Sequence, residues 1–224
     1  VRFDEVFTID VTNVNETPTA LALDNASLAE NAGTDFVVGS LSTTDPDASN
    51  TFTYSFEAGP GDTDNGLFNI SGNQLRATGS LDFEAGATRS VRVRTTDQGG
   101  LSFEQVITIG VTNVNERPTE LALSNSTIPE NSPVGAVVGT FLPTDPDAGD
   151  SFTYAIMTGD FSSFNIVGNQ LRLAFVPDYE TQSAYSIRVR ATDAGGLWWE
   201  QTFFISVTDI LEGGVPIAGT AGDD

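Results

Sequence analysis

The residues of this chain that could do chemistry are acids in short, spaced motifs. Asp145 and Asp147 are separated by one proline, and Asp82 and Glu84 by one phenylalanine. Carboxylates spaced in this way can present several oxygens to one small volume, as a hard divalent cation such as Ca²⁺ requires. Catalysis is the competing use, because paired carboxylates also hydrolyse glycosides.

The composition excludes several kinds of function. Nine basic residues face 31 acidic ones, which gives a formal net charge of −22. Nucleic acid and anionic membrane surfaces are therefore excluded as partners, since both need clustered Lys and Arg. Histidine and cysteine are absent, so no His- or Cys-based nucleophile and base can form, and we predict that the chain is not an enzyme. Apolar runs such as 203–205 are too short for direct membrane insertion.

An internal repeat organises the chain. The string VTNVNE at 11–16 returns at 111–116, an offset of 100 residues, and GNQLR at 72–76 returns at 168–172, an offset of 96. The first copy therefore carries a four-residue insertion, which we place around Gly61–Asn65. The repeat predicts four segments: 1–16 as the last strand of a preceding repeat, 17–116 and 117–212 as complete repeats, and 213–224 as a linker.

Within each repeat, the hydrophobic pattern has a period of two. Val91 and Val93 alternate with Arg92 and Arg94, and turn residues interrupt such runs at short intervals. This alternation is typical of half-buried strands. It predicts an all-β chain of two tandem seven-stranded Greek-key β-sandwiches arranged end to end.

Two smaller features follow from the same pattern. By strand alternation, Trp199 should point into the core and Trp198 outward, packed against a neighbouring strand. The segment 62–66 resembles the start of a calcium loop, but it lacks the terminal Glu, and we expect a plain solvated loop.

Five kinds of acidic motif follow one another from the first repeat, through the linker 113–116, into the second repeat. They are an Asn-preceding Glu, an Asp-x-Glu, an Asn-rich linker, an Asp-Pro-Asp and an Asp-x-Gly-Gly. In this order they resemble the cadherin repeat: 129–131 matches its Pro-Glu-Asn motif fully, and 29–31 matches it nearly. The resemblance covers both repeats, and it implies that calcium binds at the junction between successive repeats, with up to three ions per junction.

The resemblance assigns metal ligands residue by residue. Those expected at the central junction are Glu30, Asp82, Glu84, Asn113, Asn115, Glu116, Asp145, Asp147 and Asp193. Two weaker half-sites flank it. Their expected ligands are Asn13, Asn15, Glu16, Asp45, Asp47 and Asp97 at the amino end, and Glu130, Asp178, Glu180, Asp209 and Glu212 at the carboxyl end. These positions hold 16 of the 31 acids, so the negative charge is concentrated in the motifs.

The linker departs from the cadherin pattern at two positions. Asn113 stands where the family has Asp, and Glu116 replaces a second Asp. Both keep an oxygen ligand but reshape the site, so we expect one to three ions. Farther on, 217–224 resembles the opening of the glycine- and aspartate-rich calcium-binding repeats of RTX proteins.

These observations favour a calcium-rigidified extension or adhesion segment of a large protein. The resemblance implies an extracellular, membrane-associated or cell-surface location, in a secreted bacterial adhesin. The expected partners are neighbouring repeats of the same chain and, for homophilic adhesion, another adhesin copy or a cell-surface ligand. The alternative is a carbohydrate-binding β-sandwich module, which predicts a cluster of exposed aromatic side chains.

Overall fold

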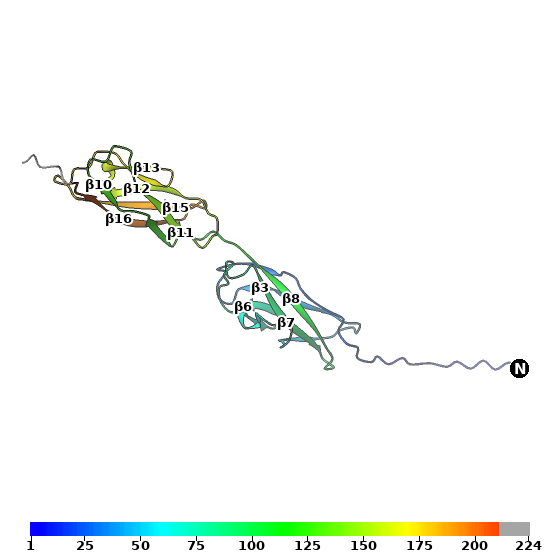
Figure 1. Ribbon diagram of the computed structural model, residues 1–224. Helices are drawn as coiled ribbons and strands as arrows, with labels where there is room; N and C mark the ends of the chain where they lie inside the picture. Colours follow the sequence, from blue (N-terminus) through cyan, green and yellow to red (C-terminus); the bar gives the residue numbers. More distant parts are fainter. Residues whose placement is uncertain (211–224) are drawn as a thin grey trace, which may run out of the picture. The chain divides into compact units, whose positions relative to one another are not determined.

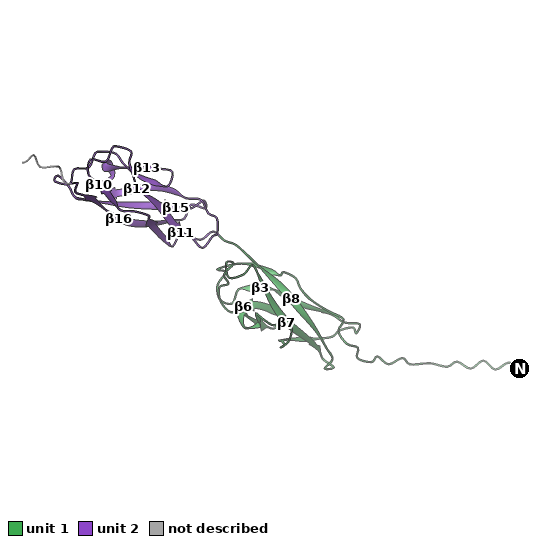
Figure 2. Cartoon of the chain, in the orientation of Figure 1, with its two compact units in different colours: residues 1–114 green, residues 115–224 purple. Residues whose placement is uncertain are grey.

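The computed structural model describes residues 1–210 and contains two compact units. Unit 1 comprises residues 1–114 and unit 2 residues 115–224 (Figure 2). The division lies two residues before the predicted start of the second repeat at 117. Glu212, the linker 213–224 and the RTX-like 217–224 lie outside the described residues, and the predicted domain limits stay predictions.

Unit 1 is a sandwich of two four-stranded sheets (Figure 1). The sheets have the orders β1-β3-β6-β5 and β2-β8-β7-β4. Their strands are β1 Ala20–Leu23, β2 Ser27–Ala29, β3 Val37–Thr44, β4 Phe52–Phe56, β5 Phe68–Ser71, β6 Gln74–Ala77, β7 Thr88–Asp97 and β8 Ser102–Thr112, with the 3-10 helix η1 at Asn65–Leu67.

Unit 2 repeats this arrangement. Its sheets have the orders β9-β11-β14-β13 and β10-β16-β15-β12. The strands are β9 Glu120–Leu123, β10 Thr127–Pro129, β11 Val137–Thr144, β12 Thr153–Gly159, β13 Phe164–Val167, β14 Gln170–Leu173, β15 Ala184–Thr192 and β16 Trp198–Thr208, with η2 at Phe161–Ser163. The prediction of two tandem all-β sandwiches is confirmed.

The first strand of each repeat is broken between the two sheets. In unit 1, β1 pairs antiparallel with β3 of one sheet, and β2 pairs parallel with β8 of the other. Unit 2 divides β9 and β10 in the same way. The break accounts for eight strands per unit where the sequence predicted seven.

Strand alternation builds the two cores as predicted. Val91 and Val93 on β7 and Ile109 on β8 are fully buried in unit 1. In unit 2, Ile187 and Ile205 are buried in the same way on β15 and β16. Each unit thus has its own hydrophobic core between its two sheets.

The tryptophans lie as expected. Trp199 packs against the core of unit 2. Trp198 is 47% exposed, and the Arg190 guanidinium of the neighbouring strand lies 4.2 Å from its ring centroid. This cation–π contact covers one face of the ring.

The insertion in unit 1 lies between β4 and η1, as the repeat offsets predicted. Its acids bind backbone: Asp64 Oδ2 accepts from the Ser90 amide at 2.7 Å, and Asp62 Oδ2 accepts from the Gly59 amide at 2.9 Å. Asp64 therefore holds the loop against β7, and Asp62 closes a turn within the loop, which gives both carboxylates a structural role.

Residues 1–19 form no strand. Phe7, Ile9 and Val11, which correspond to the buried 107, 109 and 111 of β8, are largely exposed. The part of the chain described here contains no preceding repeat for them to complete, so the assignment of 1–16 to such a repeat stays a prediction.

Arginines on the outer face of the β7–β8 pair share one acid. Glu104 accepts hydrogen bonds from Arg92 at 2.6 Å and from Arg94 at 2.6 Å. Hydrogen bonds from Arg94, and next from Arg92, lower the pKa of Glu104 below its ordinary value of 4.5. A lowered pKa means that ionised Glu104 stabilises the folded state above about pH 4.5, and that this stabilisation is lost as the pH falls through the lowered pKa.

We therefore expect Glu104→Gln to lower the melting temperature of unit 1 at pH 7 and to reduce its dependence on pH below about 4.5. Both tryptophans are in unit 2, so circular dichroism compared with tryptophan fluorescence separates the melting of the two units. Glu5→Gln, at an exposed position, is the control. Equal pH dependence in Glu104→Gln and the unmodified chain would contradict the assignment.

Candidate metal centres

The acidic motifs lie at the two ends of each sandwich because the long strands separate them. Asp82 and Glu84 precede β7, whereas Asp97 is its last residue. In unit 2, Asp178 precedes β15 and Asp193 follows it. Each unit therefore carries one acidic group at each end, and each group is described below within its own unit.

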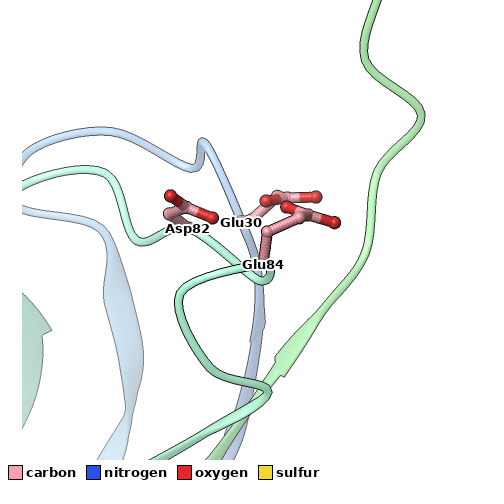
Figure 3. Close-up of side chains that lie close together, drawn as sticks. All are labelled: Glu30, Asp82 and Glu84. Carbon is pink, nitrogen blue, oxygen red and sulfur yellow. The ribbon is translucent and has the colours of Figure 1, made fainter. Parts of the chain in front are cut away.

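The first group of unit 1 consists of Glu30, Asp82 and Glu84, whose carboxylates lie close together (Figure 3). One oxygen from each lies within 4.8 Å of the others. Glu30 is only 3% exposed, and its oxygens accept from the amides of Val114 and Phe83, both at 2.8 Å. These two backbone donors position a buried carboxylate that forms no salt bridge among the described residues.

The asparagine after this glutamate has a conformational reason. Asn31 has φ 56° and Asn131 has φ 59°, in the left-handed region. Asparagine tolerates this region better than most non-glycine residues. The Glu-Asn pair therefore ends β2 and β10 with a sharp turn directly after the buried carboxylate.

The corresponding group of unit 2 consists of Glu130, Glu180 and Asp209, again with oxygens within 4.8 Å. Amides of Ile210 at 2.7 Å and Tyr179 at 3.2 Å bind Glu130 and lower its pKa. A hydrogen bond from its own backbone lowers the pKa of Glu180, but burial and repulsion from neighbouring acids outweigh it, so that pKa is raised. The raised pKa of Glu180 reflects the negative charge gathered around it.

The second group of unit 2 consists of Asp145, Asp147 and Asp150. The Asp147 amide donates to Asp145 Oδ1 at 3.0 Å, and the Glu116 amide donates to Asp147 Oδ2 at 2.7 Å. Burial, and then the neighbouring acids, raise the pKa of Asp145. The Oδ2 atoms of Asp145 and Asp150 are buried without a hydrogen-bond donor, an arrangement that costs free energy unless a cation binds them.

Asp193 and Asn115 complete this end of unit 2. Asp193 is 5% exposed and accepts from the Leu197 amide at 2.8 Å and from Asn115 Nδ2 at 3.2 Å. A Cβ at Gly195 would lie 2.3 Å from Asn115 side-chain atoms, and Gly196 has φ +93°. The two glycines of the Asp-x-Gly-Gly motif therefore have different roles: the first admits Asn115, and the second makes the turn.

The amino end of unit 1 has the same pattern. Asn15 Nδ2 donates to Asp97 Oδ2 at 3.0 Å, and the Glu16 amide donates to Asp47 Oδ2 at 2.7 Å. Further contacts of this end join Asn13 to Asp47, the Asp47 amide to Asp45 and the Leu101 amide to Asp97. Hydrogen bonds from the Glu16 amide and then Asn13 lower the pKa of Asp47, while the pKa of Glu16 is raised, chiefly by its hydrogen bond with Asp47.

The structure thus gathers most of the expected ligands within their own units. Asn113 is exposed, and Asp178 binds Thr181, which lowers its pKa. Asp150 was missed by the sequence analysis, although its spacing from Asp147 within one tight turn was a usable signal. Its counterpart in unit 1 is Asn50, an uncharged residue.

The donor sets fit calcium. All proposed side-chain ligands offer carboxylate or amide oxygen, and calcium takes six to eight such oxygens, including backbone and water. The orphaned oxygens of Asp145 and Asp150 and the buried Glu30 and Glu130 are the structural observations behind this fit. The described residues contain neither histidine nor cysteine, so softer transition-metal sites have no support.

The fold and the acidic groups are similar to those of tandem cadherin repeats. Residues 124–208 match the family model of the cadherin domain. The human extracellular fragment EC1-2 of protocadherin-24 is similar in structure, with a TM-score of 0.67 at 21% identity over 88% of this chain and 100% of that one. The protocadherin GammaB4 extracellular domain has a TM-score of 0.65 at 25% identity, over 89% of this chain and 34% of that one.

Particular relatives are found among the protocadherins. Protocadherin gamma-C4 of Homo sapiens is 28% identical over 219 residues, which is 90% of this chain and 23% of that protein. Protocadherin Fat 4 of Mus musculus is 29% identical over 215 residues, again 90% of this chain but 4% of that protein. The chain therefore spans less than a quarter of the length of these relatives. The bacterial source and the RTX-type continuation stay predictions.

Gly195→Ala should displace the Asn115 side chain and weaken metal binding at the second group of unit 2. The added Cβ would lie 2.3 Å from the end of a flexible side chain, so unit 2 should lose only about 1 kcal/mol of stability. The check is the Asn115 side-chain amide resonance together with a calcium titration. Gly79→Ala, whose Cβ would meet nothing within 4 Å, serves as control, and an unmoved Asn115 resonance would argue against this packing.

Proposed function

We propose that this chain is a calcium-binding tandem cadherin-like segment that serves as a calcium-rigidified extension or adhesion module of a larger extracellular protein. The calcium ligands would be the acidic groups at the ends of the two units. This proposal goes beyond the similarity of fold, and it stands on the ligand chemistry of this chain.

One observation carries the proposal: backbone amides of the linker 113–116 donate hydrogen bonds to carboxylates of the acidic groups. Within unit 1, the Val114 amide donates to Glu30, and within unit 2, the Glu116 amide donates to Asp147. Only one residue separates these two donors in the chain. A cation held by either carboxylate would therefore restrain the linker at that point.

The charge of the proposed central site explains why a cation would matter. Glu30, Asp82 and Glu84 from unit 1 would meet Glu116, Asp145, Asp147 and Asp193 from unit 2, together with the additional Asp150. At an effective dielectric constant near 20, two carboxylates ~5 Å apart repel by ~3 kcal/mol. Between one and three calcium ions would supply two to six positive charges and remove most of this repulsion. Without calcium, the residues 113–118 should act as a flexible hinge.

The half-sites at the outer ends would bind more weakly. Within residues 1–210, the amino-end group with Asp45, Asp47 and Asp97 and the carboxyl-end group with Glu130 and Glu180 each draw their ligands from one repeat. Their calcium affinity should therefore be lower than that of the central site. We also expect modest affinity at the centre, because extracellular calcium modules often have dissociation constants of ~10⁻⁴–10⁻³ M.

Calcium at ~10 mM should raise the melting temperature above that in chelator by on the order of 10 °C, since ligand at ~100 times the dissociation constant stabilises by ~2.7 kcal/mol. Small-angle scattering should show a narrower distribution of shapes. The double variant Asp145→Asn with Asp147→Asn keeps hydrogen-bond acceptors but removes two charges, and it should lose most of the response.

The matched control removes two charges elsewhere. Glu5→Gln with Glu120→Gln alters exposed acids outside the groups, and it should keep the full calcium response. Identical melting and scattering in calcium and in chelator for the unmodified chain would refute calcium binding. An equal loss in the control would mean that total charge, and no defined site, governs the response.

The proposals of adhesion and of a cell-surface location are based on similar proteins. Solved relatives are described as extracellular cadherin domains, and one, of protocadherin gammaB7, as a cis-dimer. By analogy, the partners of this chain would be neighbouring repeats, a second copy or a cell-surface ligand, at the cell surface. In the described part of the chain, no helix has the length and apolarity to cross a membrane. We also propose that the chain has no catalytic activity.

Beads coated with this chain should aggregate in calcium and disperse in chelator if the segment itself adheres homophilically. Beads carrying the Asp145→Asn/Asp147→Asn variant should stay dispersed. Dispersed beads in calcium, with the thermal response to calcium intact, would leave the segment as a rigid spacer and exclude homophilic adhesion by these two units.

The carbohydrate-binding alternative has gained no support. It predicted a cluster of exposed aromatic rings, and one face of Trp198 is covered by Arg190. The relatives found are protocadherins.

A further inference from the structure

A buried arginine lies behind the first acidic group of unit 1. Arg89 is 9% exposed and has the inward parity of Val91 and Val93 on β7. It pairs in register with Ile109, as Tyr185 pairs with Ile205 in unit 2. An arginine at a core position, where the other repeat has an aromatic residue, requires a specific reason because burying a charge is costly.

The Arg89 guanidinium donates hydrogen bonds to three backbone carbonyls. Nη1 donates to the oxygens of Gly86 at 2.5 Å and Thr88 at 3.1 Å, and Nη2 donates to that of Asp82 at 2.9 Å. These carbonyls span the loop that carries Asp82 and Glu84. The planar guanidinium, with five donors in a fixed geometry, is suited to joining several carbonyls at once.

Gly86 leaves the space that the Arg89 guanidinium occupies. A Cβ at Gly86 would lie 2.6 Å from Arg89 Nη1, and its φ is +154°. Unit 2 has Gln182 and Tyr185 at the equivalent positions, 96 residues on. Glycine and arginine therefore occur together in one repeat, and a larger residue and tyrosine occur together in the other.

Unit 2 holds its equivalent loop by different contacts. Tyr185 packs on Phe175 and Phe164, with ring centroids 5.1 and 5.8 Å away. Thr181 Oγ1 donates to Asp178 Oδ2 at 2.8 Å. The position of Phe175 is Gly79 in unit 1, so the aromatic packing has no equivalent there and the arginine takes its place.

We propose that Arg89 and Gly86 form a positioning pair that holds the loop 82–88 in its ligand-bearing conformation and so sets the calcium affinity of the first acidic group of unit 1. The inference rests on the proposed calcium function. The three carboxylates of this group repel one another when no cation is bound, and the arginine restrains the loop that bears two of them. A neighbour that orients metal ligands in this way typically changes metal affinity by ~10–100-fold when it is removed.

The test is a calcium titration followed by amide resonances of the whole chain. The Phe83 and Val114 amides donate to Glu30, and the Tyr179 and Ile210 amides donate to Glu130. Each pair therefore reports on its own acidic group. Arg89→Lys keeps the charge but loses the forked geometry, and it should raise the calcium midpoint of the unit 1 amides by about tenfold while leaving that of the unit 2 amides unchanged.

Two further variants keep the test decisive. Gly86→Ala leaves the arginine in place but displaces its guanidinium, and it should shift the same midpoint in the same direction. The triple variant Gly79→Phe, Gly86→Gln, Arg89→Tyr installs the contacts of unit 2 and should restore the midpoint in part. A midpoint that is unmoved by Arg89→Lys, or equal shifts in both amide pairs, would overturn the proposal.

Failure of the positioning pair can be told apart from failure of the calcium proposal. If no amide of the unmodified chain responds to calcium, the proposed function fails. The pair is still tested in chelator, where the stability costs of Gly86→Ala and Arg89→Lys should be less than additive because both disturb the same contact. Strictly additive costs would overturn it.

Discussion

Crowded carboxylates are the constraint on which the rest of this structure depends. Buried acids such as Glu30 and Glu130, at 3% and 2% exposure, are stable only where donors compensate the lost water. Each accepts from two backbone amides, one in the loop before a long strand and one at the end of the last strand. These hydrogen bonds tie each acid to the loop before the long strand and to the end of the last strand. The acidic group therefore depends on the packing of these two segments, and their packing depends on the acid.

Strand length then separates the acidic groups. β7 runs from Thr88 to Asp97, and at ~3.3 Å per residue its ends lie about 30 Å apart. No cation can bind both groups of one unit. The first group of unit 1 and both groups of unit 2 each bring one oxygen from each of three carboxylates within 4.8 Å of the others, fewer than the six to eight that calcium takes. Completion of a site therefore requires water, backbone or a neighbouring repeat. This physical need agrees with a function that depends on repeats in series.

Periodicity and internal repetition made most of the fold predictable. Two-residue alternation identified β7, β8, β15 and β16, and the change in repeat offset located the insertion before η1. The break between β1 and β2 was not predicted, although the buried positions change from odd to even between Leu21 and Leu28. Asp150 was missed since the motif was read as an Asp-x-Asp pair, whereas the turn brings the third acid beside it.

Arg89 is a second feature whose contacts could not be predicted from the sequence pattern. The alternation of Val91 and Val93 predicts that the side chain at position 89 points inward. It does not predict which groups a charged side chain would bind there. That depends on carbonyls presented by the loop 82–88 and on the space that Gly86 leaves. Both repeats carry the Glu-Asn and Asp-x-Glu motifs, but the loop beside them is held by an arginine bound to backbone carbonyls in unit 1 and by an aromatic cluster in unit 2. The carboxylates are thus the feature that the two repeats share while the contacts behind them differ, as the proposed role in binding cations would require.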